Sequence, residues 1–303
     1  MLEITQVVLR AQQTVESRFD HCFQPGEITV VLGANQSGKT DLCRLIAGLN
    51  TRAQGRVFLD GADISDLNPR QRAVSMVYQA FINYPNLNVA QNIASPLVAR
   101  GGDKIAVARR VRDIAERLSI AQYLQRFPHE LSGGQQQRLA IARALAKEAR
   151  VLLLDEPLVN LDFKLREALE VELRDLLHAS GTVVIYTSSD PRDVFSLGDE
   201  VLLLEEGCKL QSGAPIDVYR MPVNASAMAL LADPGINHLS HQGKAGAVRP
   251  EHVRVALSEQ IQAPQQLAFN LQVTAYETNG DESFIHGQVD GEDWVMRCDG
   301  MFK

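Results

Sequence analysis

Hydrophobic residues along this chain form two patterns, short continuous runs and longer stretches with helical spacing. The continuous runs lie at 28–32, 151–154, 183–186 and 201–204. Short apolar runs are typical of strands that are buried on both faces, as in the parallel sheets of α/β proteins. Helical spacing between Leu165 and Leu177 predicts a helix directly before the third run. The pattern therefore predicts an α/β domain.

A separate helical stretch interrupts this domain between the first two runs. One apolar stripe repeats at helical spacing and alternates with charged residues; its members are Val107, Val111, Ile114, Ala115 and Leu118. The stripe predicts a helical subdomain, inserted into the α/β domain at about residues 85–130.

The two ends of the chain carry weaker, alternating patterns. Residues 1 to about 25 predict an edge sheet, and beyond about residue 240 short alternating segments are separated by Asn279-Gly280 and Asp290-Gly291. The tail is therefore predicted to be a small antiparallel β domain. Because Asp233-Pro234-Gly235 breaks the pattern before it, we expect one domain over 1–235 and a second over 236–303.

The composition of the chain argues against some classes of binding partner. The 303 residues carry a formal net charge of −7, and the pI is near 5.5. An acidic chain without a clustered basic face argues against a nucleic-acid surface. No apolar run approaches the ~20 residues of a membrane span, and the N-terminus lacks a signal pattern. Any attachment to a membrane is therefore expected to come through partner proteins.

A glycine-rich segment after the first apolar run matches the pattern G-x-x-x-x-G-K-[ST]. Between a strand and a helix this pattern binds phosphate, because the glycines let backbone N–H groups point inward and the helix dipole adds positive charge. Lys39 is expected to contact the β- and γ-phosphates, and Thr40 a Mg²⁺ ion. The pattern also occurs by chance in unrelated proteins. The expected nucleotide-binding residues here are Gly33, Asn35, Gln36, Ser37, Gly38, Lys39 and Thr40.

Two acidic residues follow the second apolar run. Asp155 and Glu156 are expected at the C-terminal edge of the sheet, where ligands bind in open α/β proteins. Asp155 is then placed to hold the Mg²⁺ shell and Glu156 to polarise an attacking water as general base. A solvated acidic pair at an ordinary strand end has the same appearance, so a third motif is needed to decide.

The third motif is Leu131-Ser132-Gly133-Gly134-Gln135-Gln136-Gln137-Arg138, between the phosphate loop and the acidic pair. The order of these motifs resembles the ATP-binding cassette (ABC) family, for which this eight-residue signature is specific. The resemblance implies a P-loop ATPase fold in which two chains sandwich each ATP. It also implies that the signature contacts the γ-phosphate held by the opposing subunit, through Ser132, Gly133, Gly134 and Gln135.

Two further segments resemble the ATPase subunits of carbohydrate and polyol importers. Val77-Tyr78-Gln79 implies that Gln79 contacts Mg²⁺ and the lytic water. The stretch after it implies a groove that receives a helix from the membrane subunit, with docking area from Phe81, Tyr84 and Leu87. Packing inside the helical subdomain is the alternative role for these three. Arg249-Pro250-Glu251 resembles a tail segment of the same importers, whose β domain is OB-like (similar to an oligonucleotide/oligosaccharide-binding barrel), and we expect a shortened version of it.

The chain departs from the family pattern around its own nucleotide. Ser189 stands where the family has a switch histidine on the γ-phosphate, and a serine is shorter and cannot become cationic. Asp41 follows Thr40, where a second hydroxyl residue usually faces the α-phosphate. The Asp41 carboxylate would repel this phosphate; the alternative is that Asp41 turns away and caps the helix. Arg10 aligns with an aromatic residue that stacks on adenine.

Three more positions of this half-site can be compared with the family pattern. Gln36 replaces a glycine common in the phosphate loop, and Val159 replaces the usual serine of the loop after Glu156. Asp162, a nucleotide-binding position of that same loop, is retained.

These departures all fall in the half-site for the chain's own ATP, whereas its signature is intact. We therefore predict an ATP-hydrolysing subunit of an ABC importer for a sugar, polyol or similar small solute, using ATP and Mg²⁺. The expected partners are a second ATPase subunit in an asymmetric heterodimer, two transmembrane permease subunits and an extracytoplasmic solute-binding protein. The expected location is peripheral, on the cytoplasmic face of the bacterial inner membrane.

Two other interpretations are open. In a symmetric homodimer, Ser189 or a neighbouring residue would substitute for the histidine. A soluble cassette protein of DNA repair or translation is the other class. Repair members carry a long coiled-coil insertion and translation members carry two cassettes, and this sequence shows neither.

Overall fold

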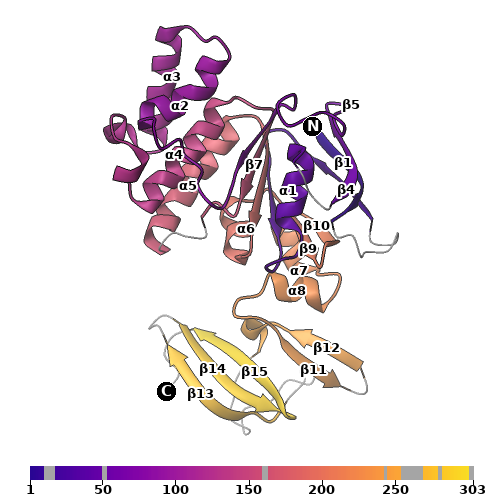
Figure 1. The fold of residues 1–303 in the computed structure, drawn as a ribbon. Helices are drawn as coiled ribbons and strands as arrows, with labels where there is room; N and C mark the ends of the chain where they lie inside the picture. The colour runs from indigo at the N-terminus through magenta and orange to yellow at the C-terminus, as the bar shows by residue number, and fades with distance from the viewer. Residues whose placement is uncertain are drawn as a thin grey trace. The chain divides into compact units, whose positions relative to one another are not determined.

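The computed structural model describes residues 1–9, 18–49, 53–158, 163–241, 244–253, 269–278 and 282–299. The chain divides into two compact units, Met1–Val218 and Tyr219–Lys303 (Figure 1). The sequence-based boundary between 235 and 236 lies later in the chain and stays a prediction. Arg10, Val159 and Asp162 lie outside the described residues.

A six-stranded sheet forms the centre of the first unit. Its order is β10-β9-β3-β8-β7-β6, and all neighbouring pairs are parallel except β9 with β10. Each of the four apolar runs lies in one of these strands, as predicted, and they are buried because the sheet is covered on both faces. The strands are β3 (Ile28–Leu32), β6 (Val74–Val77), β7 (Val151–Asp155), β8 (Val183–Ser188), β9 (Glu200–Glu205) and β10 (Cys208–Gly213).

A second, antiparallel sheet has the order β2-β1-β4-β5. Its strands are β1 (Leu2–Val8), β2 (Phe19–Phe23), β4 (Gln54–Leu59) and β5 (Ala62–Asp63). One hydrophobic cluster joins the buried faces of both sheets to helix α1 (Lys39–Ala47), with members that include Ile4, Val31, Leu42 and Leu153. Packing on α1 therefore secures the helix that follows the glycine-rich loop.

The predicted helical subdomain contains α2 (Val89–Ala99), α3 (Lys104–Arg117) and the 3-10 helices η2 (Ala121–Tyr123) and η3 (Pro128–Glu130). In Figure 1, α2 and α3 lie together above α4 (Gly133–Ala146), and both pack against it. Three residues of the predicted apolar stripe, Val111, Ile114 and Ala115, form the buried face of α3. Helices α5 (Phe163–Ala179) and α6 (Pro191–Leu197) flank β8 in the chain and pack on each other.

The second unit is mainly antiparallel β structure, as predicted. Helix α7 (Pro215–Arg220) spans the division, and α8 (Ala225–Leu230), β11 (Asn237–His241), β12 (Lys244–Val248) and the 3-10 helix η4 (Pro250–His252) follow. Strands β13 (Gln272–Thr278), β14 (Glu282–Val289) and β15 (Glu292–Asp299) form a sheet in that order. Asp290 and Gly291 both have positive φ, 51° and 86°, which is the backbone of a type I′ hairpin turn.

Among the helices that the structure describes, none has the length and apolar character needed to cross a membrane.

Candidate active site

The order of the central sheet brings the predicted motifs to one edge. Strand β8 lies between β3 and β7, with Leu32 beside Ser188 and Asp155 beside Thr187. Strand β6 lies on the far side of β7, so the segment after Val77 reaches the same edge. Because these strands are parallel, the segments that follow them all emerge at their shared C-terminal edge.

The loop of residues 33–38 is tight, and its glycines are required by contact. A Cβ on Gly33 would lie 2.4 Å from both the Leu204 carbonyl oxygen and Ser37 Oγ. Gly38 has φ +104°, and a Cβ there would lie 3.0 Å from Leu9 Cδ1. Gln36 has φ 65°, a left-handed conformation that costs a non-glycine residue roughly 1–2 kcal/mol. A glycine would adopt this conformation without that cost, which explains why glycine is common at this position of the loop.

Lys39 lies over this loop. Its ammonium group donates hydrogen bonds to the carbonyl oxygens of Gly33 and Ala34, at 2.7 and 2.9 Å, and lies 3.2 Å from Glu156 Oε1. The side chain is only 4% exposed, so the charge is held in place by these oxygens. The arrangement presents one fixed cation beside the loop backbone.

Two features of the loop suit a bound phosphate. Ser37 Oγ is buried and has no hydrogen-bond partner among the described residues. Helix α1 begins at Lys39 after Gly38, and no side-chain hydrogen bond caps it. An uncapped helix N-terminus offers N–H donors and a positive dipole end, which together favour an anion.

Oxygen atoms of Thr40 and Asp155 lie together beside the loop. Thr40 Oγ1 donates to Asp155 Oδ1 at 3.1 Å, and Thr187 Oγ1 donates to the same atom at 2.9 Å. Burial raises the pKa of the Asp155 carboxyl, while the hydrogen bonds from the two threonines act in the opposite direction. A hydroxyl and a carboxylate are the hard oxygen donors that Mg²⁺ prefers, so this pair fits that ion.

Glu156 is held from two sides. Its backbone N–H donates to Thr187 Oγ1 at 3.0 Å, and Gln79 Nε2 donates to its Oε2 at 3.2 Å. Glu156 itself has φ 46°, so the chain turns sharply directly after β7. Thr187 thus connects both acidic residues, a role that the sequence analysis missed. The available signal was a hydroxyl residue directly after the apolar run 183–186.

The raised pKa of Asp155 gives a stability prediction. The ionised carboxylate costs folding free energy in full above its folded-state pKa, and the cost disappears below the unfolded pKa of about 3.9. Asp155→Asn keeps an oxygen for both threonine hydroxyls and removes the buried charge. We expect it to stabilise the nucleotide-free protein by about 1 kcal/mol, or ~2–4 °C in Tm, at pH 8.

Thermal unfolding at pH 8 and pH 4 measures this effect, which should shrink at pH 4. Asp175→Asn, which removes an exposed carboxylate on α5, is the control and should leave Tm unchanged. A lower Tm for Asp155→Asn at both pH values would contradict the assignment.

The signature segment begins helix α4. Ser132 is the N-cap: its Oγ accepts from the Gln135 N–H at 3.4 Å, and Gln135 Oε1 accepts from the Ser132 N–H at 3.0 Å. Ser132 and Gly133 are exposed, and nothing lies within 4 Å of a Cβ built on Gly133. Helix α4 packs against α2, α3 and β6, whereas α1 packs against β4, β6, β7 and β8. The signature is therefore an open helix N-terminus on a different helix from the glycine-rich loop.

Ser189 follows β8 and is exposed. The preceding residue, Ser188, adjoins the loop because the Gly33 N–H donates to its carbonyl oxygen at 3.3 Å. Asp41 lies in the first turn of α1, where the helix dipole favours an acid. The N-cap is Gly38, so the structure does not show Asp41 capping this helix.

A groove of about 510 Å³ lies between the helical subdomain and the sheet. Tyr84 lines it, and the Arg143 guanidinium lies 4.3 Å from the centre of the Tyr84 ring. Phe81 and Leu87 are half-buried and are not among its lining residues. Of the three residues predicted to dock a membrane subunit, Tyr84 is therefore the one that is exposed and lines the groove.

Comparison with known proteins identifies the family. The family model described as ABC transporter matches residues 17–159. The sn-glycerol-3-phosphate import ATP-binding protein of Agrobacterium fabrum is 34% identical over 297 residues, covering 91% of this chain and 84% of that protein. The chain belongs to the ABC transporter family. A second relative with the same kind of name, from Pectobacterium atrosepticum, is 33% identical over 90% of this cassette chain and 82% of its own length.

Solved structures agree with the cassette fold. A subunit, CbiO1, of an ABC transporter complex from Clostridium perfringens is 25% identical, with a TM-score of 0.64 over 72% of this chain and 90% of that chain. A dimeric ATP-binding cassette in a post-hydrolysis state with ADP and Pi is also 25% identical, with a TM-score of 0.61 over 71% of this chain and 99% of its own. The predicted ABC ATPase fold is confirmed, and this cassette is an ATP hydrolase.

Proposed function

We propose that this cassette is the nucleotide-binding subunit of an importer for a sugar, polyol or similar small solute. The relatives named above are import ATP-binding proteins for sn-glycerol-3-phosphate, a phosphorylated polyol, which supports this solute class. The cassette would work at the cytoplasmic face of the bacterial inner membrane, attached through two permease subunits, with an extracytoplasmic solute-binding protein delivering the solute.

The site at the sheet edge would bind Mg·ATP. The loop and Lys39 would hold the phosphates, and Thr40, Asp155 and Gln79 would hold Mg²⁺, which supplies positive charge against the phosphate oxygens. Glu156 lies between Lys39 and Gln79, where it would accept a proton from the attacking water. Arg10 and Asp162, which lie outside the described residues, would contact the nucleotide as the family resemblance implies.

The observation that carries the asymmetric part of the proposal is the contrast between Ser189 and Ser132. At the sheet edge, Ser189 would offer a shorter donor than histidine, and one that cannot become cationic as charge develops on the phosphate. At the signature, Ser132 closes a complete capping box on an exposed helix N-terminus. The cassette would therefore bind ATP in its own site with slow turnover and donate a sound signature to a second, competent ATPase subunit.

The groove beside Tyr84 would receive a helix of a permease subunit. An exposed aromatic ring with a guanidinium stacked on it is typical of interface cores. Closure of the two cassettes around ATP would then move the docked permease helices, and hydrolysis and release would return them.

Glu156→Gln tests the proposal in the complex that forms in the native host. The cassette is tagged, purified with its membrane partners, and assayed for steady-state ATP hydrolysis. Because the own site contributes little turnover, we expect the substitution to leave the ATPase rate of the complex largely unchanged. The matched control is the equivalent Glu→Gln change in the partner ATPase subunit, which should remove most activity, since a general base contributes ~10²–10⁴-fold.

Near-complete loss of activity with Glu156→Gln would refute the asymmetric arrangement. The subunits in the purified complex decide between the alternatives. One ATPase chain in two copies, with cooperative hydrolysis by this cassette alone, would favour the symmetric homodimer. Purification without any permease would contradict the importer role.

A further inference from the structure

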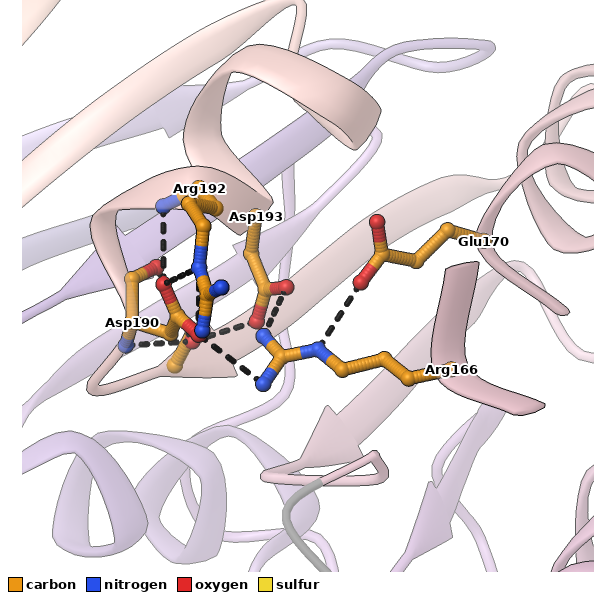
Figure 2. Close-up of polar contacts among 6 residues, drawn as sticks. Arg166, Glu170, Asp190, Arg192 and Asp193 are labelled. Atoms are coloured by element: carbon orange, nitrogen blue, oxygen red, sulfur yellow. Dashed lines mark hydrogen bonds and ion pairs between the residues drawn. The ribbon is translucent and has the colours of Figure 1, made fainter. Parts of the chain in front are cut away.

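A charged cluster behind the sheet edge ties the loop that carries Ser189 to helix α5. It consists of Arg166 and Glu170 on α5 together with Asp190, Arg192 and Asp193 at the start of α6 (Figure 2). The members are held by short ion pairs, and four of the five side chains are less than a fifth exposed. None of them has a part in the site described above.

Arg166 is the centre of this cluster, because its guanidinium reaches three carboxylates. Nε lies 2.8 Å from Glu170 Oε1 and Nη1 lies 2.9 Å from Asp190 Oδ2, while Nη2 pairs with Asp193 Oδ1. Figure 2 shows the arginine extending from α5 to the two aspartates. The guanidinium fork therefore bridges two elements that are distant in the sequence.

Ser189 is flanked on both sides by residues of this network. On one side Ser188 Oγ donates to Asp193 Oδ2, and on the other Asp190 pairs directly with Arg166. The Asp190 N–H also donates to Ser188 Oγ at 2.9 Å, which closes the turn around residue 189. Any displacement of α5 at Arg166 would therefore be passed to both neighbours of Ser189.

The positive charge of Arg166 balances the carboxylates around it. Burial acts to lower the pKa of Arg166, but its bonds to Asp193 and Glu170 and the charge of Asp190 raise it above its ordinary value. Asp193 is 3% exposed, and burial raises its pKa despite the bonds from Ser188 and Arg166. Without the guanidinium, the buried Asp193 carboxylate would face Asp190 and Glu170, with Arg192 paired to Asp190 as the nearby cation.

We infer that Arg166 is a positioning residue: it holds the loop of residues 188–190 against α5 and so sets where residue 189 stands beside the phosphate loop. The catalytic part of this inference rests on the proposed role of Ser189 at the γ-phosphate. The mechanical part, a loop held by Arg166, stands on the contacts alone.

The experiment uses Arg166→Met, and also Arg166→Met with Asp193→Asn, which removes the unpaired buried charge and protects the fold. Arg174→Met is the matched control, because Arg174 also joins α5 to α6, through the Ser196 carbonyl oxygen at 3.2 Å, but at the end of α6 away from Ser189. The variants are made in the intact transporter complex. Amide hydrogen exchange at residues 189 and 190, ATP affinity and turnover are measured for each.

We expect exchange at residues 189 and 190 to rise by about 10-fold or more in both Arg166 variants and to stay at the wild-type rate in Arg174→Met. When the Arg166 changes are combined with Ser189→His, turnover at this site should fall ~10- to 100-fold relative to Ser189→His alone, because a misplaced catalytic group costs that much, while ATP affinity changes little. Arg166→Lys should restore part of the loss.

Wild-type exchange in the loop of both Arg166 variants would overturn the inference. So would an equal turnover loss in Arg174→Met, or a loss in ATP affinity as large as the loss in turnover. These outcomes are separate from a failure of the proposed function. Glu156→Gln tests the asymmetric arrangement and leaves this cluster intact, whereas the exchange measurement is valid whether or not the arrangement is asymmetric.

Discussion

Replacing Ser189 with histidine is expected to raise ATP turnover at this cassette's own site by ~10²–10³-fold. Ser189 lies directly after β8, whose Ser188 carbonyl oxygen accepts a hydrogen bond from the Gly33 N–H, so residue 189 stands next to the phosphate loop. A histidine there would supply a longer donor that can carry positive charge as the γ-phosphate is transferred. The magnitude is that of restoring one preorganised donor to a developing charge.

The measurement requires the two composite sites to be separated. The transporter complex therefore carries the catalytic Glu→Gln change in the partner ATPase subunit, so that the remaining hydrolysis belongs to the site containing Lys39 and Glu156. Ser189→Ala is the control and should give no gain. Adding Glu156→Gln to Ser189→His should remove the gain. Equal turnover in the histidine and alanine variants would show that residue 189 does not limit this site.

Replacing Ser132 with arginine is expected to lower turnover at the partner's site by at least ~10²-fold. Ser132 caps α4, and Ser132 and Gly133 are exposed at the helix N-terminus. Arginine would fill the space that a phosphate needs and block the approach to the N–H groups of this helix N-terminus. Because the affected ATP belongs to the opposing subunit, the loss should appear there and not at the cassette's own loop.

Turnover is measured in the complex that already carries Glu156→Gln in this cassette, so that the signal comes from the partner's site. Loss of the N-cap by itself costs about 1 kcal/mol of stability, so the control variant has to lose a helix N-cap as well. Asn88→Ala is that control, because Asn88 closes the same kind of capping box on α2. Unchanged hydrolysis in Ser132→Arg would contradict the role of the signature as a donor to the partner.

Much of the fold could be predicted from local patterns. The continuous apolar runs are strands because each is long enough for one strand and apolar on both faces, and the stripe on α3 is helical because its spacing matches one helix face. Strands β4, β5, β6, β10, β11 and β12 were not assigned from the sequence. They are short or only partly buried in most cases, so their hydrophobic pattern is weak.

The sequence also named the residues that meet at the sheet edge, but not how they touch. Thr187 bonds Asp155 and the Glu156 backbone only because β8 lies between β3 and β7, an order that no local pattern contains. The left-handed backbone of Gln36 likewise appears only in the folded loop. The Arg166 cluster joins two helices through charges whose pairing depends on tertiary packing.

The sequence by itself thus determined the family motifs, the strands β3, β7, β8 and β9 of the central sheet and the departure at Ser189, because short-range residue types and spacing carry that information. The tertiary structure decided which side chains hold Asp155 and Glu156, that Tyr84 lines the groove beside Arg143, and that Arg166 pairs with the residues around Ser189. The physical reason is that strand order and helix packing bring together residues from distant parts of the chain, and hydrogen bonds and ion pairs depend on that proximity.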